Sequence, residues 1–328
     1  MKHTARLKFI ILLVLLVPFF SASALAADTF EENLTAPGTI SLDVDTGSGS
    51  IEVTSGSGRD VSVIGTVKVQ KRGIFNRKPD NADELIQAIL DNPPVEFEGD
   101  TLKVGHIKDR SLRRAVSISF EIVVPADTSV RADSGSGSIM VTDIAAPVNA
   151  DTGSGSVKLT NIGGEVSADT GSGSIELRNI DGYVSADTGS GSINAEGVAG
   201  GFHGDTGSGS IRLVQTAPGD VSADTGSGSI KLTGVVGALK ADAGSGRIEV
   251  QGQQEGDWKL DAGSGSITVT LPDDAAFNLD AESRTGGIHI AEHFPVQGQI
   301  SKKHVKGAVN GGGHRLRIDT GSGTIRVE

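Results

Sequence analysis

The sequence predicts an all-β fold: a parallel β-helix, or β-solenoid, with coils of 18–19 residues and a short helical insertion near the N-terminus. Three observations lead to this prediction. The hexapeptide Asp-Thr-Gly-Ser-Gly-Ser recurs at a fixed period, apolar residues keep the same positions in each period, and glycine-rich bends separate them. A fixed period of this size is typical of stacked solenoid repeats.

The hexapeptide occurs six times in full and four more times as a near-copy. From Asp133 to Asp280 every step between its aspartates is 18 or 19 residues, when Asp280 is counted as an eroded copy. Disordered linkers rich in Gly and Ser do not keep apolar positions in phase, so the register predicts a folded array. The motif aspartates are Asp45, Asp133, Asp151, Asp169, Asp187, Asp205, Asp224, Asp242, Asp261 and Asp319.

One unit shows how a coil is built. Val166 and Ala168 alternate with polar residues before the glycines, and Ile175 and Leu177 do so after them. Each pair predicts a short strand with one buried face. Ala168 and Ile175 are seven residues apart, an odd number, so both point inward only if the chain turns a corner between them. The hexapeptide is predicted to form this corner, because glycine permits the bend and the close stacking of coils.

A second corner is expected at residues 179–182, where Asn, Asp and Gly are common turn residues. At the first corner, we expect the motif aspartates to accept hydrogen bonds from nearby hydroxyls and backbone amides. An aspartic protease needs two carboxylates that share a proton in a closed cleft. Equivalent corners along a rod offer no such cleft, so the repeat disfavours this activity despite the Asp-Thr-Gly sequence.

The N-terminal segment has the features of an export signal. Basic residues precede an apolar run from Phe9 to Phe20, and Ala-Leu-Ala follows at residues 24–26. This order predicts a signal peptide over residues 1–26, cleaved near Ala26. The run is short for a bilayer span, which disfavours an uncleaved anchor. We therefore expect an extracytoplasmic protein, in the periplasm or secreted, with no transmembrane segment in the mature chain.

The rest of the chain divides into three parts. Residues 27–70 are predicted to form the first solenoid coils, and residues 116–328 the main repeat array. The final coil is expected to end in the strand at residues 325–328, with its edge either covered by residues 297–313 or left open.

Residues 71–115 are predicted to be an insertion that contains one short helix, at about residues 81–91. Asn81 is a candidate N-cap with Glu84 three residues later, and Pro93 stops the helix. The insertion is expected to cap an end or a flank of the solenoid, because terminal repeats need covering.

Charge and composition narrow the classes of partner. After residue 26 the chain carries 26 Lys and Arg against 41 Asp and Glu, a net charge of −15, which disfavours nucleic acid. The lack of cysteine excludes disulfides and a thiol nucleophile. A basic cluster interrupts the acidic surface, and a site for anionic glycans or lipid headgroups is weighed against ordinary solvated charges. Its members are Lys68, Lys71, Arg72, Arg77, Lys78, Lys103, Lys108, Arg110, Arg113 and Arg114.

Repeats of V-x-A-D-T-G-S-G-S-I-x-L after a signal peptide resemble the bacterial putative-adhesin family of β-strand-repeat proteins, a domain of unknown function. Residues 116–139, VSISFEIVVPADTSVRADSGSGSI, resemble the entry into that family's repeat. The resemblance covers nearly all of the mature chain. It implies an exported, single-chain parallel β-helix, and it implies no set of catalytic residues.

Two columns of the repeat are candidate ligand sites. Stacked carboxylates repel one another, and Ca²⁺ would relieve this repulsion; hydrogen bonding at the corners is the alternative role. No other cofactor is indicated. Hydroxyls in a surface ladder would bind sugars through many weak contacts. The candidate calcium column is Asp151, Asp169, Asp187, Asp205 and Asp224, and the candidate surface ladder is Thr152, Thr170, Thr188, Thr206 and Thr225.

Two functions from different classes remain. The first is an adhesin-like interaction module that binds a glycan or envelope polymer through the repetitive surface of the rod. The alternative is a structural scaffold of the cell envelope that self-assembles through open coil edges. No serine has a nucleophile-elbow sequence around it, so we assign no catalytic residues and do not expect an enzyme.

Overall fold

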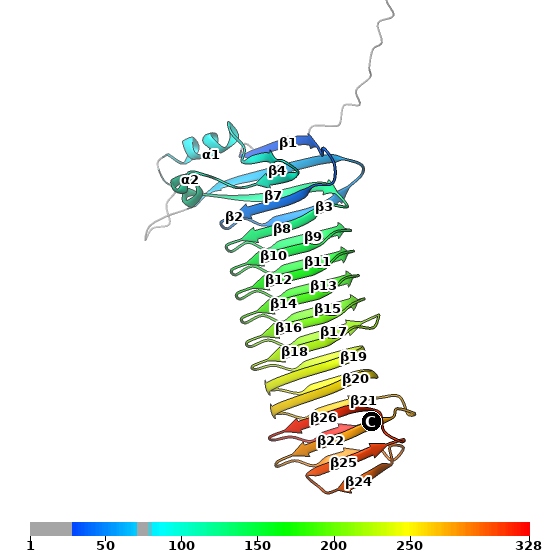
Figure 1. Ribbon diagram of the computed structural model, residues 1–328. Helices are drawn as coiled ribbons and strands as arrows, with labels where there is room; N and C mark the ends of the chain where they lie inside the picture. The colour runs from blue at the N-terminus through cyan, green and yellow to red at the C-terminus, as the bar shows by residue number, and fades with distance from the viewer. Residues whose placement is uncertain (1–27, 71–78, 80) are drawn as a thin grey trace, which may run out of the picture.

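The computed structural model describes residues 28–70, 79 and 81–328, and its strands stack into a long solenoid (Figure 1). The predicted signal peptide lies outside the described residues, as do Lys71, Arg72, Arg77 and Lys78 of the basic cluster. Among the described residues, no helix is both long and apolar enough to cross a membrane. The 27 strands of the described residues form one continuous sheet, so the predicted all-β solenoid is confirmed.

One wall of the solenoid carries the motif aspartates and is called the aspartate wall here. Its strands precede the glycine-rich corners and pair in parallel through the array. From one end to the other they are β5 (Val95–Glu98), β6 (Thr101–Val104), β2 (Ser41–Thr46), β8 (Ser129–Ser134), β10 (Val148–Thr152), β12 (Val166–Thr170), β14 (Val184–Thr188), β16 (Phe202–Thr206), β18 (Val221–Thr225), the second halves of β19 (Ile230–Ser245) and β20 (Ile248–Ser264), β26 (His314–Thr320), β22 (Phe277–Ser283), β25 (His304–Val309) and β24 (Val296–Ile300).

The opposite wall holds the strands that follow the corners and is called the isoleucine wall. It is also parallel through the array and becomes antiparallel only among its first three strands. In order they are β1 (Thr29–Thr35), β4 (Asp60–Val69), β7 (Val116–Pro125), β3 (Ile51–Gly56), β9 (Ile139–Ile144), β11 (Val157–Ile162), β13 (Ile175–Ile180), β15 (Ile193–Val198), β17 (Ile211–Gln215), the first halves of β19 and β20, β21 (Ile267–Thr270), β27 (Ile325–Val327) and β23 (Ile288–Ile290).

The core lies between the two walls. In β12, Val166 and Ala168 are buried, and in β13, Ile175 and Leu177 are buried, as the alternation predicts. Large aromatic side chains fill the same column further along, and Phe202 and Trp258 are each only 1% exposed. Burial of these repeated apolar side chains is the main force that holds the coils together.

The second predicted corner is built around left-handed asparagines. Asn161 and Asn179 have φ angles of 56° and 54°, a conformation that asparagine tolerates better than most residues. Their side chains form a ladder between coils. The Asn179 amide donates to Asn161 at 2.9 Å, and the Asn161 amide donates to Asp143 at 2.7 Å.

The N-terminal end of the array is covered by the insertion and by antiparallel strands (Figure 1). Strand β6 occupies the free edge of β2, and β7 occupies the free edge of β3. The predicted helix is confirmed as α1 (Ala82–Leu90), which packs against β4. The Asn81 side chain, however, makes no capping hydrogen bond. A second helix, α2 (Arg110–Ala115), was not predicted; Asp109 caps it by accepting from the backbone N–H groups of residues 111 and 112.

The C-terminal end does not follow sequence order. The last coil of the chain, β26 and β27, lies between the β20–β21 coil and the β22–β23 coil. The C-terminus in Figure 1 accordingly lies inside the solenoid, above β22 and β25. The expectation that residues 325–328 form an outer edge is therefore wrong, because β27 pairs on both sides. Residues 297–313 do cover an edge, but it is the edge of β22.

The position predicted for the eroded motif copy, with its aspartate at Asp280, is also wrong, because the copy begins two residues later. The register pairs Glu282 with Asp319 and Asp280 with Arg317. Ser283 then occupies the threonine position of the motif. Asp280 instead faces the covering hairpin, where it contacts His304 at 3.1 Å and Lys306 at 3.0 Å.

Candidate functional site

The threonines predicted as a surface ladder are buried, so that prediction is wrong. Thr170 is 1% exposed; its hydroxyl donates to the Gly155 carbonyl at 2.8 Å and accepts from the Gly173 N–H at 3.0 Å. Alternation places the threonine on the inner face, two residues beyond the buried alanine of the same strand. The exposed fractions of the five are 1% for Thr152, 1% for Thr170, 5% for Thr188, 1% for Thr206 and 1% for Thr225.

The motif aspartates form a continuous column on the outside of the aspartate wall. Parallel pairing places one aspartate directly beside the next, as for Asp151, Asp169 and Asp187. The hydrogen bonds expected at the corner are made by threonine instead, because the aspartates point outward. Among Asp151, Asp169, Asp187, Asp205 and Asp224, the one side-chain hydrogen bond runs from Ser185 to Asp187 at 3.4 Å.

The electrostatics of this column are unfavourable to ionisation. Partial burial, together with the neighbouring carboxylates of Asp169 and Asp133, raises the pKa of Asp151 above its ordinary value. Burial and the neighbours Asp242 and Asp319 raise the pKa of Asp261 in the same way. Within the described chain, no cluster of three or more His, Cys, Asp or Glu side chains is arranged to hold a metal ion. Calcium binding by the column therefore stays a prediction.

Basic side chains flank only the ends of the column. The outward residue two positions before the aspartate is Arg131 near one end and Lys240 towards the other. Arg131 bonds Asp133 at 2.9 Å. In the coils between them this position is uncharged or holds His203. A neutral strip thus adjoins the acidic column in the middle of the wall.

A groove of about 580 Å³ lies on the outer surface of the aspartate wall; it covers this strip at Asn149, Ser167 and Ser185 and extends past its end to Arg131 and Asp43. It crosses five coils, from β2 to β14, and is about as large as a small-molecule site. Its polar lining consists of Ser41, Asp43, Ser129, Arg131, Asn149, Glu165, Ser167 and Ser185. Pro147, Glu165 and Tyr183, which immediately precede β10, β12 and β14, form one side of it.

Tyr183 is the only tyrosine in the sequence, and it is 48% exposed. Its ring lies over Gly201 of the next coil, where a Cβ atom would come within 3.0 Å of Tyr183 Cδ2. The Cδ2–Cε2 edge of the ring therefore lies against the Gly201 backbone, at the β14 end of the groove. The sequence analysis missed this residue; its place in the turn before a strand, where neighbouring coils have Glu165 and Gly201, was the available signal.

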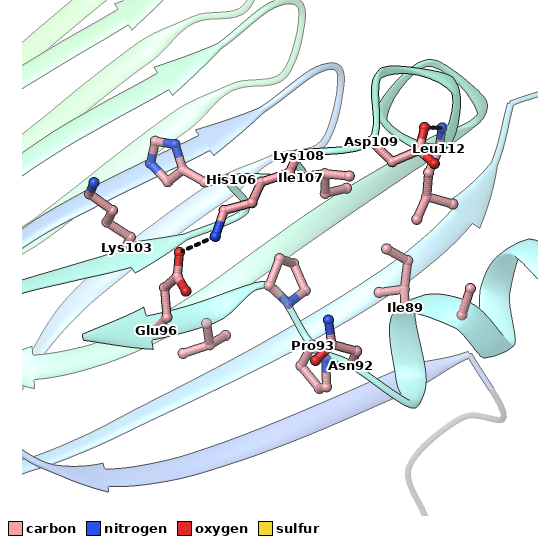
Figure 2. Close-up of a pocket in the computed structure, with 13 residues that line it drawn as sticks. Ile89, Asn92, Pro93, Glu96, Lys103, His106, Ile107, Lys108, Asp109 and Leu112 are labelled. Carbon is pink, nitrogen blue, oxygen red and sulfur yellow. Dashed lines mark hydrogen bonds and ion pairs between the residues drawn. The ribbon is translucent and has the colours of Figure 1, made fainter. Parts of the chain in front are cut away.

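A second cavity, of about 470 Å³, lies in the N-terminal insertion (Figure 2). It is bounded by α1, α2 and the β5–β6 hairpin. Figure 2 shows Lys103 and His106 on one side of it and Ile89 and Leu112 on the other. Five described members of the predicted basic cluster belong to the same segment, Lys103, Lys108, Arg110, Arg113 and Arg114.

Comparison with protein families found a match to part of the chain. The family model described as Toastrack DUF4097 matches residues 184–328. A comparison with curated proteins found no match.

Three solved structures cover most of the chain at low similarity. A putative cell adhesion protein from Clostridium sporogenes is 11% identical, with a TM-score of 0.25, over 91% of this chain and 98% of the other. A putative adhesin from Bacteroides fragilis is 13% identical, with a TM-score of 0.31, over 92% and 98%. A putative lipid binding protein from Parabacteroides distasonis is 14% identical, with a TM-score of 0.39, over 92% and 97%.

The resemblance noted in the repeats is thereby confirmed at the level of the family model: residues 184–328 of this β-solenoid match Toastrack DUF4097, a domain of unknown function.

Proposed function

We propose that the protein is an extracytoplasmic, adhesin-like binding module that holds a linear glycan or envelope polymer in the groove of the aspartate wall. The observation that supports this proposal is the pairing of an extended groove with one exposed aromatic ring. Sugars offer an apolar face that stacks on aromatic side chains and hydroxyls that bond to polar ones. Tyr183 would supply the first contact, and Asn149, Ser167 and Ser185 the second.

The groove replaces the threonine ladder as the proposed surface. A ladder of buried hydroxyls, each already bonded to backbone, has nothing to offer a ligand. The groove instead lines up at least one polar residue per coil, and successive coils repeat at roughly 5 Å. A linear polymer that runs along the solenoid axis would contact several coils at once, and weak contacts would add up. The proposal is one of binding without catalysis.

The test is binding of the purified chain to a panel of bacterial and host glycans by titration calorimetry. Tyr183→Ala should weaken binding by roughly two- to tenfold, the scale expected for the loss of one aromatic contact. Met140→Ala is the matched control, because Met140 is a 39% exposed apolar side chain on the isoleucine wall. Equal glycan affinities of the unmodified chain, Tyr183→Ala and Met140→Ala would overturn the groove as the binding site.

Calcium at the aspartate column is a separate proposal, supported only by the raised pKa values and the register. It predicts that Ca²⁺ raises the melting temperature and that a chelator reverses the change, because a ligand that binds the folded state stabilises it. Asp169→Asn should reduce the shift. A melting temperature that does not respond to Ca²⁺ would contradict it.

The structural-scaffold alternative keeps one specific observation in its favour, the outer edge of β24. This strand pairs with β25 on one side, and Ile300 at its end is 65% exposed. Its sequence, Val-Gln-Gly-Gln-Ile, contains none of the charges or prolines that usually protect an edge strand. We propose a second copy of the chain as the occupant of this edge.

Charge also favours antiparallel pairing of two β24 strands about Gly298. Lys302 and Lys303 of one copy would then lie opposite the segment that contains Glu292 in the other. A proline at residue 300 would block this edge without disturbing the hairpin. Successive N–H groups along a strand point alternately towards one neighbouring strand and towards the other. The Ser301 N–H donates to the His304 carbonyl within the hairpin, so the Ile300 N–H points outward.

Ile300→Pro should therefore abolish concentration-dependent dimers or filaments in sedimentation, while Ile300→Val should preserve them. A protein that stays monomeric at high concentration would contradict this alternative. A proline in β27, by contrast, would disrupt an internal strand and would not report on an open edge.

A further inference from the structure

We propose that the cavity in the N-terminal insertion is a binding site for a single-chain amphiphile with an anionic head group. The site is separate from the groove of the aspartate wall and does not depend on the proposed glycan function. It is defined by the residues around the cavity, which divide into an apolar part and a basic part (Figure 2).

The apolar part comes from four elements. Ile89 lies in α1, Val95 in β5, Leu112 in α2 and Ile107 in the loop before α2, and Pro93 precedes β5. Ile89 is buried, whereas the other four are only partly buried. Partly buried apolar side chains that converge on one cavity are the usual lining of a small-molecule site. A purely polar ligand, such as inorganic phosphate, would leave this surface in contact with water.

The basic part lies on the opposite side of the cavity. Lys103, His106 and Lys108 all line it, and each lies near carboxylates of β2, β5 or their neighbours. Lys103 pairs with Glu98, and His106 lies 3.4 Å from Asp43. Asp109, another acidic lining residue, is occupied in capping α2.

Lys108 is the cation most available to a ligand. Its Nζ lies 3.4 Å from Glu96 Oε1, with side chains that are 87% and 54% exposed. Such an exposed pair contributes little to stability, so a ligand anion can replace Glu96 at small cost. Residues 95–114, which hold β5, β6 and α2, carry five Lys or Arg and a histidine against four acidic residues, in a chain whose net charge is −12. This segment therefore lacks the acidic excess of the rest of the chain, which favours an anionic head over a cationic one.

The combination determines the ligand class. An apolar chain would cover Ile89, Val95, Ile107 and Leu112, and its anionic head would lie between Lys103 and Lys108. A carboxylate and a phosphate head share this chemistry, and either would form charge-assisted hydrogen bonds with the lysines.

The test uses the full chain with defined probes below their micelle concentrations: dodecanoate, dodecyl phosphate, dodecyl maltoside and inorganic phosphate. The chain has no cysteine, so Ala88→Cys gives a unique thiol at the cavity. A maleimide should label this thiol at least about tenfold more slowly when an anionic amphiphile is bound in the cavity. Glu84→Cys, on the same helix but outside the cavity, is the matched control and should show no protection.

The two anionic probes distinguish a carboxylate from a phosphate head. Lys108→Ala should weaken binding of the better probe about tenfold, in line with the loss of one charge-assisted contact. Leu112→Ser should weaken it by a similar factor. The exposed Lys302→Ala, at the other end of the solenoid, should have no effect. Equal protection by dodecyl maltoside, protection of Glu84→Cys, or no protection by any probe would each overturn the proposal.

Discussion

The hydroxyl of Thr170 donates to the carbonyl of Gly155, in the preceding coil, at 2.8 Å. The same oxygen accepts from the N–H of Gly173, three residues further along its own chain, at 3.0 Å. One side chain thus joins two coils and fixes the corner between two strands. The contact recurs along the array, and serine makes it at Ser134 and Ser283.

Replacing this hydroxyl should therefore be costly. Thr170→Val keeps the shape but leaves a buried carbonyl and a buried N–H without their partner. We expect a loss of about 1–3 kcal/mol in the free energy of unfolding. Thr170→Ser keeps the oxygen and should cost much less. Urea unfolding of both variants checks this, and equal losses would show that methyl packing, rather than hydrogen bonding, explains the repeated threonine.

The second glycine of the motif should tolerate no side chain. A Cβ on Gly173 would lie 1.8 Å from the Gly155 carbonyl oxygen, so the coils would have to separate. Gly173→Ala should destabilise the fold by about 1–3 kcal/mol or more, the range for overpacked sites. The exposed neighbour Ser172→Ala is the control and should leave the melting temperature unchanged. A neutral Gly173→Ala would contradict the close stacking.

The aspartate column predicts a pH dependence of stability. Burial and the neighbouring carboxylates raise the pKa of Asp151 above its ordinary value of 3.8. The folded state therefore binds this proton more tightly than the unfolded state, and stability falls as pH rises from 3.8 through the folded-state pKa. Above that range the penalty is constant.

Asp151→Asn removes the penalty. At neutral pH it should raise the free energy of unfolding by a few tenths of a kcal/mol, as expected for relief of like charges on neighbouring strands. The gain should disappear below the ordinary pKa, where the aspartate is protonated in both states. Urea unfolding over a pH series measures it, with the exposed loop residue Asp274→Asn as control. A gain that persists in acid would contradict the electrostatic account.

The position of the last coil gives a topological prediction. Because β26 lies between β20 and β22, deletion of residues 312–328 should remove an internal layer, not an end. Amides of β22 and β25 should then lose their protection from hydrogen exchange, although neither is deleted. Equal rates of amide exchange in β22 of the truncated and full chains would contradict the placement of the last coil between β20 and β22.

The fold was largely predictable because each coil repeats the same information. Inward positions such as Val166 and Ile175 alternate in every copy, so the period, the two walls and the corner follow from the sequence. The order of coils at the C-terminal end could not follow from it. Every strand there offers the same apolar face and free edge, so a repeat pattern does not say which copy pairs with which.

The site was less predictable, since alternation is easily misjudged at a bend. Thr170 is polar and repeated, which suggested a surface role, yet it lies inside and uses its oxygen locally. Tyr183 occurs once, and a repeat analysis emphasises what recurs. The cavity in the insertion depends on α2, a helix of six residues that is too short to show an amphipathic period.

The central claim is that a linear polymer binds along the groove, and its most direct measurement is affinity against ligand length. Oligomers of a glycan found to bind should be titrated in order of size into the full chain and into Tyr183→Ala. The account predicts that affinity rises until the oligomer spans the five coils, roughly 20 Å, and then levels off. It also predicts that Tyr183→Ala lowers affinity at every length. Affinity that depends neither on length nor on Tyr183 would contradict the groove as the binding site.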